Sequence, residues 1–252
     1  MDLRARLHRN VMEVSAVNGM LPGGILERPE GAVLYSPSPE AAFFLNGVFR
    51  EPGRGDAAAL LDRAQALFAG RGGGFVVYVH PDDDDLTAAC DALGLEEFVS
   101  RYPEMVCSAP LPVPDADLRP VQNLADAAAY WTICDVAYPS IGLPPQMFST
   151  TFPPGMLLGE NVEACLAFID DTAVACASVW MAEGIGMIGW VGTLPEARGR
   201  GAGAAVTVWA TNRAFELGAD VAALQASVMG EQIYARLGFE EHYSYRIVGR
   251  SS

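Results

Sequence analysis

The chain has 252 residues, 51% of them hydrophobic, which is enough for one domain or two of ordinary size. Its formal net charge of −15 argues against nucleic acid or an anionic membrane as a partner, because both would repel it. All sixteen basic residues are arginine, so a Walker-type phosphate loop and a Schiff-base lysine are excluded.

No apolar run approaches the length that spans a membrane, and the first residues lack the apolar segment of a signal peptide. We therefore expect a cytoplasmic protein. The cysteines are odd in number and scattered, which predicts buried free thiols and neither a disulfide nor a metal site. They are Cys90, Cys107, Cys134, Cys165 and Cys176.

The first half of the sequence predicts alternating strands and helices. The expected elements are a strand at 43–49, a helix at 56–68, a strand at 74–80 and a helix at 86–93. The acidic run Asp82–Asp85 lacks the spacing of a calcium loop and indicates a solvated helix start. A Pro-rich stretch at 109–117 is the candidate linker, so we expect domains at 1–108 and 118–252.

The second half predicts more strands than helices, in mixed order, which favours an α+β fold. The expected strands are 118–122, 164–170, 172–182, 185–194, 221–227 and 241–248. The expected helices are 124–137, 145–151, 204–217 and 231–237.

Two pieces of the first half match pieces of the second, which suggests an internal duplication. Arg50-Glu-Pro-Gly-Arg-Gly55 precedes a helix as Arg198-Gly-Arg-Gly-Ala-Gly203 does, and Cys90–Glu97 matches Tyr234–Glu241. In the first copy Pro52 removes one amide and Asp56 puts a carboxylate beside the loop. We therefore expect that 1–108 does not bind the ligand of the second copy.

The loop Arg198–Gly203 lies between an apolar strand pattern and an amphipathic helix. Backbone amides and the positive end of a helix dipole grip phosphate at such a junction, and glycines let the anion approach the backbone. A bare glycine turn is the plainer alternative. The dinucleotide fingerprint is another, but no acidic residue ends the following strand, since Ser227 stands there.

With its surroundings the loop resembles the GNAT superfamily of N-acetyltransferases, over about residues 118–248. The stretches that carry the resemblance are Val191-Gly-Thr-Leu-Pro-Glu-Ala-Arg-Gly-Arg-Gly-Ala-Gly203, Leu224-Gln-Ala-Ser227 and Tyr234-Ala-Arg-Leu-Gly-Phe239. The whole chain resembles tandem GNAT proteins whose N-terminal copy is degenerate. The resemblance implies two GNAT-like domains, each a mixed, mostly antiparallel sheet flanked by helices, and acetyl-CoA as co-substrate.

The resemblance also implies roles for particular residues. A splayed strand would offer the backbone of Val191, Gly192 and Thr193 to the acyl and pantetheine groups, with Gly189 and Gly192 allowing a bulge. The Val191 amide would stabilise the oxyanion. The diphosphate would be bound at Arg198, Gly199, Arg200, Gly201, Ala202 and Gly203. Tyr234 matches the family's proton donor near the CoA sulfur, and Ser227 would hold CoA or a water, although a core tyrosine and a plain strand-end hydroxyl are the alternatives.

The general base is not identifiable, because 185–194 contains no carboxylate where many relatives have a glutamate. His242 is a weak candidate. An acceptor site is expected near Trp190, Tyr138 and 139–152, although Tyr138 and Phe148 also suit core packing.

The leading prediction is transfer of acetyl from acetyl-CoA to the amine of a small molecule or peptide by direct attack. The alternative is an acyl-CoA-binding or sensing module without turnover, and a nucleotide-dependent oxidoreductase comes third. Acceptor, acyl length and oligomeric state stay open, with a homodimer as one alternative.

Overall fold

The computed structural model describes residues 2–251 in two compact units. The first unit comprises the chain up to Glu104 together with the segment from Glu241 onward, and the second unit is Met105–Glu240. The division therefore differs at both ends from the 118–252 domain expected from sequence. The last strand groups with the first unit because it pairs with a strand of that unit, a long-range contact that local sequence patterns do not encode.

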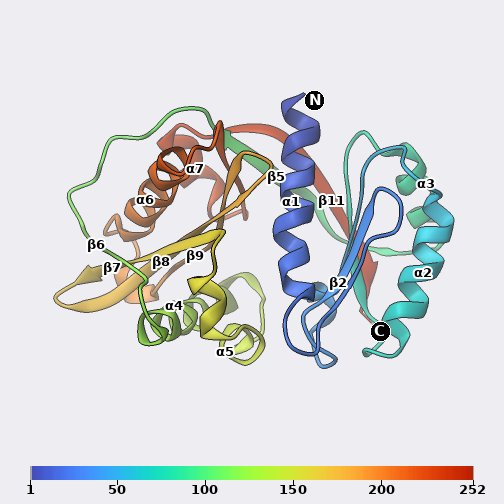
Figure 1. The fold of residues 1–252 in the computed structure, drawn as a ribbon, viewed down its shortest axis with the longest axis horizontal. Coiled ribbons are helices and arrows are strands. Elements are labelled where there is room, and N and C mark those ends of the chain that lie inside the picture. Colours follow the sequence, from blue (N-terminus) through green and yellow to red (C-terminus); the bar gives the residue numbers. More distant parts are fainter. Residues whose placement is uncertain (1, 252) are drawn as a thin grey trace. The chain divides into compact units, whose positions relative to one another are not determined.

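The first unit is a mixed sheet with helices on both faces. Its elements are α1 (Leu3–Gly19), β1 (Ile25–Glu27), β2 (Ala32–Ser36), a 3-10 turn (Phe43–Leu45), β3 (Gly47–Arg50), α2 (Ala57–Ala69), β4 (Phe75–Val79), α3 (Asp84–Ala92), β5 (Glu96–Cys107), which runs on into the second unit, and β11 (Glu240–Arg250). The strand order is β1-β2-β3-β4-β11, and only β3 and β4 are parallel. Figure 1 shows α1 on one side of β2 and β11 and α2 and α3 on the other.

No expectation from the sequence covered α1, β1, β2 or β5. Helix α1 interleaves charged and apolar residues without a clean stripe, and its formation depends on burying Leu7, Val11 and Ala16 against the sheet. The strand expected at 43–49 was wrong in its first half, where Phe43–Leu45 forms a 3-10 turn before β3. Aromatic residues favour strands, so the Phe-rich pattern predicted a strand where the chain forms a 3-10 turn.

The second unit matches its predicted elements closely. They are β6 (Asp117–Pro120), α4 (Leu124–Ala137), two 3-10 turns (Tyr138–Ile141 and Pro154–Leu158), α5 (Met147–Thr151), β7 (Val162–Ile169), β8 (Thr172–Ala182), β9 (Ile185–Thr193), a further 3-10 turn (Pro195–Ala197), α6 (Ala202–Glu216), β10 (Val221–Gln225) and α7 (Glu231–Leu237). The strand order is β10-β9-β8-β7-β6, antiparallel except for β9 beside β10. In Figure 1, α4 and α5 lie on the opposite side of this sheet from α6 and α7.

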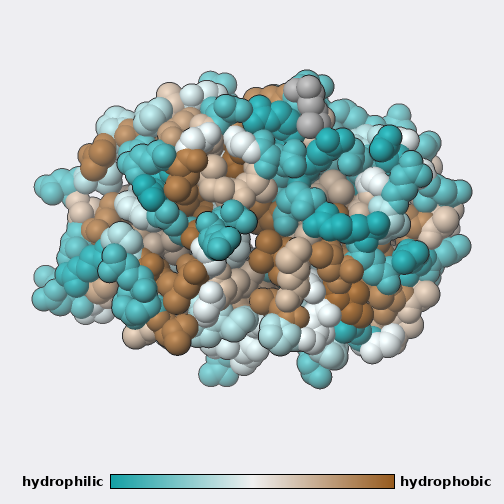
Figure 2. All heavy atoms as spheres, viewed as in Figure 1, coloured by the Kyte–Doolittle hydropathy of each residue, from teal (hydrophilic) through white to brown (hydrophobic). Residues whose placement is uncertain are grey.

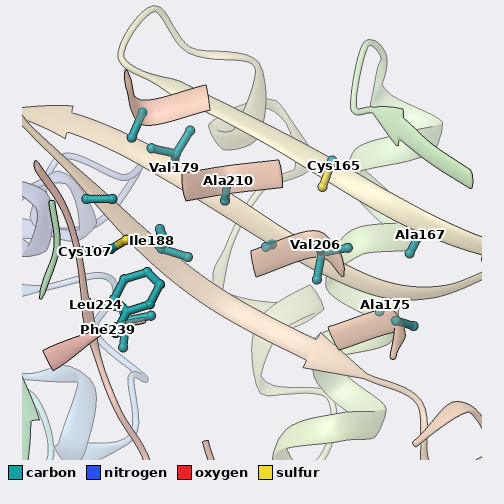
Figure 3. Close-up of a cluster of buried hydrophobic side chains, with 14 of the residues drawn as sticks. Cys107, Cys165, Ala167, Ala175, Val179, Ile188, Val206, Ala210, Leu224 and Phe239 are labelled. Carbon is teal, nitrogen blue, oxygen red and sulfur yellow. The ribbon is translucent and has the colours of Figure 1, made fainter. Parts of the chain in front are cut away.

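The core of the second unit forms where α6 packs on the sheet (Figure 3). Small residues four apart on α6 allow close approach: a Cβ added to Gly186 of β9 would lie 2.3 Å from the Cβ of Ala214. Strand β8 alternates, with Ala177 and Val179 in this cluster and Ser178 on the other face. The same sheet therefore presents a polar side chain toward α4.

The two halves of the chain repeat one order of elements. The series β1-β2-β3-α2-β4-α3-β5 corresponds to β7-β8-β9-α6-β10-α7-β11. In both series the third and fourth strands pair in parallel across a helix, β3 with β4 and β9 with β10. This order bears out the duplicated plan and the mixed α+β class.

The five cysteines are buried free thiols, as predicted. Within residues 2–251 no helix has the length and apolar character needed to cross a membrane. Hydrophilic residues cover much of the face seen in Figure 2, with smaller apolar groups between them.

Candidate functional site

The central feature of the second unit is a fork between two parallel strands. Strand β9 pairs with β10 from Ile185 to Ile188, and this pairing ends at Leu224 of β10. Strand β9 nevertheless continues to Thr193, still paired on its other edge with β8. Within the described chain, the edge of β9 from 189 to 193 therefore has no strand beside it on the β10 side.

A β-bulge interrupts β9 at the start of this fork. The register with β8 shifts between Cys176 and Ser178, and Trp190 adopts a left-handed backbone with φ +50°. The bulge was expected, with Gly189 and Gly192 as the residues that permit it. The left-handed residue is instead a tryptophan, a strained conformation for a bulky side chain.

Gly192 is needed for close packing, because a Cβ there would lie 3.1 Å from Cys176 Sγ and 3.2 Å from Ile133. Beyond the bulge the direction of each backbone amide follows from one hydrogen bond. The Leu194 amide donates to the carbonyl of Val174 on β8 at 2.9 Å. Amides alternate between the two edges of a strand, so Gly192 also faces β8, whereas Val191 and Thr193 face the fork. Of the three residues that the resemblance picked for acyl and pantetheine contacts, Val191 and Thr193 thus point their amides into the open edge, and Gly192 does not.

The glycine loop lies between β9 and the start of α6. Gly199 and Gly201 have φ of +74° and +83°, and Gly201 is the N-cap residue of the fifteen-residue helix α6. Within residues 2–251 four loop amides donate to no group of the protein, and the Arg200 amide makes only a 3.4 Å turn contact with Ala197. The four are Gly199, Gly201, Ala202 and Gly203.

This loop is suited to an anion, because unpaired amides and the helix dipole act together at a helix N-terminus. A Cβ on Gly203 would lie 2.7 Å from Thr193 Oγ1, so the first turn of α6 sits directly against the end of β9. The fork and the loop are therefore adjacent parts of one surface.

The two loop arginines differ in their surroundings. Arg198 donates to the carbonyl of Ala137 at 3.3 Å and to Ser140 Oγ at 3.1 Å, so its guanidinium ties the loop to the end of α4. Arg200 is exposed, and its guanidinium makes no hydrogen bond or ion pair within the described chain. Arg200 is the loop arginine whose charge is available to an anion.

Tyr234 lies on α7, half-buried, with its phenol ring over Gly230. Burial raises the pKa of Tyr234 to about 12, so its hydroxyl is protonated at any ordinary working pH. Ser227 follows β10, and its Oγ accepts a hydrogen bond from the Gly230 amide at 3.2 Å. Ser227 therefore stabilises the turn that leads into α7. Its hydroxyl can still donate a hydrogen bond of its own.

Carboxylates are not grouped near the fork. Strand β9 contains none, and Asp135 of α4 accepts hydrogen bonds from the amides of Phe148 and Ser149 at the start of α5. His242 groups with the first unit. Among the described residues no three His, Cys, Asp or Glu side chains could hold a metal ion together.

The aromatic residues expected near the acceptor pack on one another. The Trp190 ring lies 4.9 Å from Phe148 and 5.8 Å from Tyr138, measured between ring centroids. Phe148 is fully buried and serves as core, whereas Trp190 and Tyr138 are half-buried. Two residues that the sequence analysis missed, Tyr130 and Ser178, bond to carbonyls of the bulge; a buried tyrosine in an apolar helix pattern carried no signal of this role.

The corresponding loop of the first unit is occupied by its own side chains. Arg50 is 1% exposed and donates to the carbonyls of Arg54 and Gly55 and to Asp83 Oδ1. Asp56 caps α2 by accepting from the Ala59 amide at 3.0 Å. The positive-φ glycines are Gly53 and Gly55, so they correspond to Gly199 and Gly201 and not, as the sequence match implied, to Gly201 and Gly203.

Comparison with known proteins agrees with this geometry. The model of the acetyltransferase (GNAT) family matches residues 128–239, which include the fork, the loop and Tyr234. No curated protein matches the sequence.

Solved structures match over nearly the whole chain. A GCN5-related N-acetyltransferase from Kribbella flavida is 24% identical, with a TM-score of 0.77 over 100% of this chain and 97% of that one. A tandem GNAT protein from the clavulanic acid biosynthesis pathway is 16% identical, with a TM-score of 0.65 over 96% and 88%. A GCN5-related N-acetyltransferase from Sphaerobacter thermophilus is 17% identical, with a TM-score of 0.63 over 89% and 82%.

The fold is a GNAT-type α+β architecture in duplicate. Residues 128–239 match the GNAT family of acetyltransferases, and the chain as a whole has the fold of tandem GNAT proteins.

Proposed function

We propose that the second unit is an acetyl-CoA-dependent N-acetyltransferase acting on the amine of a small molecule or peptide. The observation that carries the proposal is the open edge of β9 beside a loop of unpaired amides. The loop amides, with Arg200, would hold the diphosphate of CoA. Thr193 and Val191 would bind the pantetheine arm and the acyl carbonyl in turn. The 1–108, 109–117 and 118–252 division remains our proposal for the two evolutionary copies.

The chemistry requires three functions. The amide of Val191, directed into the fork, would stabilise the oxyanion formed when a neutral amine attacks the thioester, a contact worth about 3 kcal/mol. Tyr234 would donate a proton to the departing thiolate, since its hydroxyl is protonated at working pH. No side chain is assigned as the base, because β9 carries no carboxylate.

The test is release of CoA thiol from acetyl-CoA in the presence of a panel of amines. We expect release with at least one amine, and a fall of roughly a hundredfold in Tyr234→Phe with the affinity for CoA retained. Tyr243→Phe, which removes a buried tyrosine hydroxyl from the first unit, is the control and should keep its activity.

The lack of a carboxylate on β9 favours one alternative, a module that binds acyl-CoA without turnover. Binding of acetyl-CoA with no thiol release under any amine would support the module and refute the enzyme. Failure to bind CoA at all would refute both.

The first unit would not bind CoA. Its loop carbonyls and the N-terminus of α2 are already engaged by Arg50 and Asp56. We also expect no nucleic-acid or membrane partner, given the net charge of −15.

A further inference from the structure

The bulge of β9 is fixed from the side opposite the fork by a buried set of donors. Tyr130 on α4 is fully buried, and its hydroxyl lies 3.0 Å from the carbonyl oxygen of Trp190 and 3.2 Å from that of Gly189. Ser178 of β8 donates to the Gly189 carbonyl at 2.9 Å and accepts from Trp180 Nε1 at 2.9 Å. Both carbonyls of the bulge are therefore held by side chains.

The Trp190 carbonyl matters because of the peptide unit to which it belongs. A trans peptide is planar, so its C=O and N–H point in opposite directions. The N–H paired with the Trp190 carbonyl is that of Val191. A donor that holds the Trp190 oxygen on the α4 side of the strand thereby directs the Val191 amide the other way, into the fork.

The backbone at this point needs such support. Trp190 has φ +50°, a conformation that costs a bulky residue on the order of 1–3 kcal/mol. The Sγ atoms of Cys134 and Cys176 also lie 3.6 and 3.7 Å from the Trp190 oxygen, but thiols are weak donors. Tyr130 is the strong donor on this oxygen, and burial raises its pKa well above the usual value, so the proton stays on the phenol.

We propose that Tyr130 is a positioning residue: its hydroxyl, bound to the Trp190 carbonyl, aims the Val191 amide at the thioester carbonyl of acetyl-CoA. The inference rests on the proposed function of the second unit. Ser178 lies beside the Tyr130 hydroxyl but gives its own proton to the Gly189 carbonyl and not to that of Trp190, so it does not share this role.

The experiment measures the infrared stretch of the acetyl carbonyl in carbon-13-labelled acetyl-CoA bound to the full chain, without any amine. A hydrogen bond from Val191 lowers this frequency. We expect a downshift with the wild type, at most half of that downshift with Tyr130→Phe, and the wild-type downshift with Ser178→Ala. The Kd for acetyl-CoA should change less than about threefold in both variants, because the diphosphate is held at α6.

With an accepted amine, Tyr130→Phe should lower kcat about tenfold at unchanged KM for acetyl-CoA, less than the loss of a whole oxyanion donor. Tyr245→Phe is the matched control, since it removes a fully buried, hydrogen-bonded tyrosine hydroxyl from the first unit. It should lower stability without changing the carbonyl frequency. If Tyr130→Phe does not fold, 3-fluorotyrosine at position 130, a stronger donor of nearly the same size, should enlarge the downshift.

An unchanged frequency in Tyr130→Phe, or an equal loss in Ser178→Ala, overturns the role assigned to Tyr130. A wild-type protein that shows the downshift but transfers acetyl to no amine refutes the proposed catalysis and leaves the positioning of the amide supported. Binding without any downshift in the wild type overturns the inference.

Discussion

At the scale of single residues, two glycines at opposite ends of α6 have the same backbone and different surroundings. Gly201 has φ +83° at the N-cap, and Gly218 has φ +90° just beyond the last turn. A Cβ on either would meet no atom within 4 Å. Alanine at either position therefore costs backbone strain alone, about 1 kcal/mol.

Gly201→Ala and Gly218→Ala should accordingly lower the melting temperature by similar amounts, about 2–4 °C for a chain of this size. Only Gly201→Ala should weaken CoA binding, by about tenfold, because relaxing its φ turns the loop amides away from the diphosphate. Titration calorimetry and thermal unfolding of both variants give the comparison. Equal CoA affinities for the two variants would contradict the phosphate role of the loop.

At the scale of elements, α1 is joined to the first sheet by a chain of hydrogen bonds. His8 Nε2 lies 2.8 Å from the Arg50 carbonyl, so this nitrogen carries the proton and Nδ1 accepts from the Tyr245 hydroxyl at 2.7 Å. The Tyr245 and Tyr243 hydroxyls are 2.9 Å apart. Burial lowers the pKa of His8 to about 4 and that of His80, whose ring is 4.9 Å away, to about 3.

This histidine pair makes the stability of the first unit depend on acidity. Below pH 6.5 both histidines become protonated in the unfolded chain. In the folded chain His8 is protonated only below about pH 4 and His80 only below about pH 3. The stabilisation is thus complete above pH 6.5 and is lost as the pH falls. For His8 alone the loss between pH 7 and pH 4.5 is about 2 kcal/mol.

Urea unfolding of wild type, His8→Gln and His242→Gln at pH 7 and pH 4.5 would measure this loss. His8→Gln should be less stable at pH 7 and should lose less on acidification than the wild type. His242 is exposed, and its variant should follow the wild type at both values. An identical acid-induced loss in His8→Gln and wild type would show that His8 is not responsible.

At the scale of the whole molecule, a duplicated chain retains one loop that can take an anion. The two series of elements are the same, yet in the first unit Asp56 caps an amide of α2 and the buried Arg50 bonds the loop carbonyls, whereas the loop amides of the second unit are unpaired. One CoA per chain is the expected stoichiometry.

A carboxylate added beside the open loop should repel an anion bound there. Ala204, in the first turn of α6, is half-buried, and Ala204→Asp puts a negative charge beside the loop amides. We expect CoA affinity to fall roughly thirtyfold, from like-charge repulsion of about 2 kcal/mol, with little loss of stability because acids favour helix N-termini. The isosteric Ala204→Asn is the control. A second CoA per chain in calorimetry, or CoA binding that Ala204→Asp does not weaken, would contradict a single CoA site at this loop.

The sequence by itself determined the elements of the second half, because their apolar runs have clear start and stop residues, such as Asn123 before α4 and Gly238 after α7. It predicted the bounds of α4, β8 and α7. It also predicted a tight glycine loop before α6, since Gly199 and Gly201 adopt positive φ that few other residues tolerate. The sequence did not predict helix α1, because that helix depends on packing against strands far along the chain. Tertiary structure alone decided that the last strand joins the first unit, that Trp190 is the strained residue of the bulge, and that Tyr130 holds its carbonyl. Each of these depends on contacts between segments distant in sequence. Such contacts stabilise the fold but produce no periodic pattern of residues in either segment.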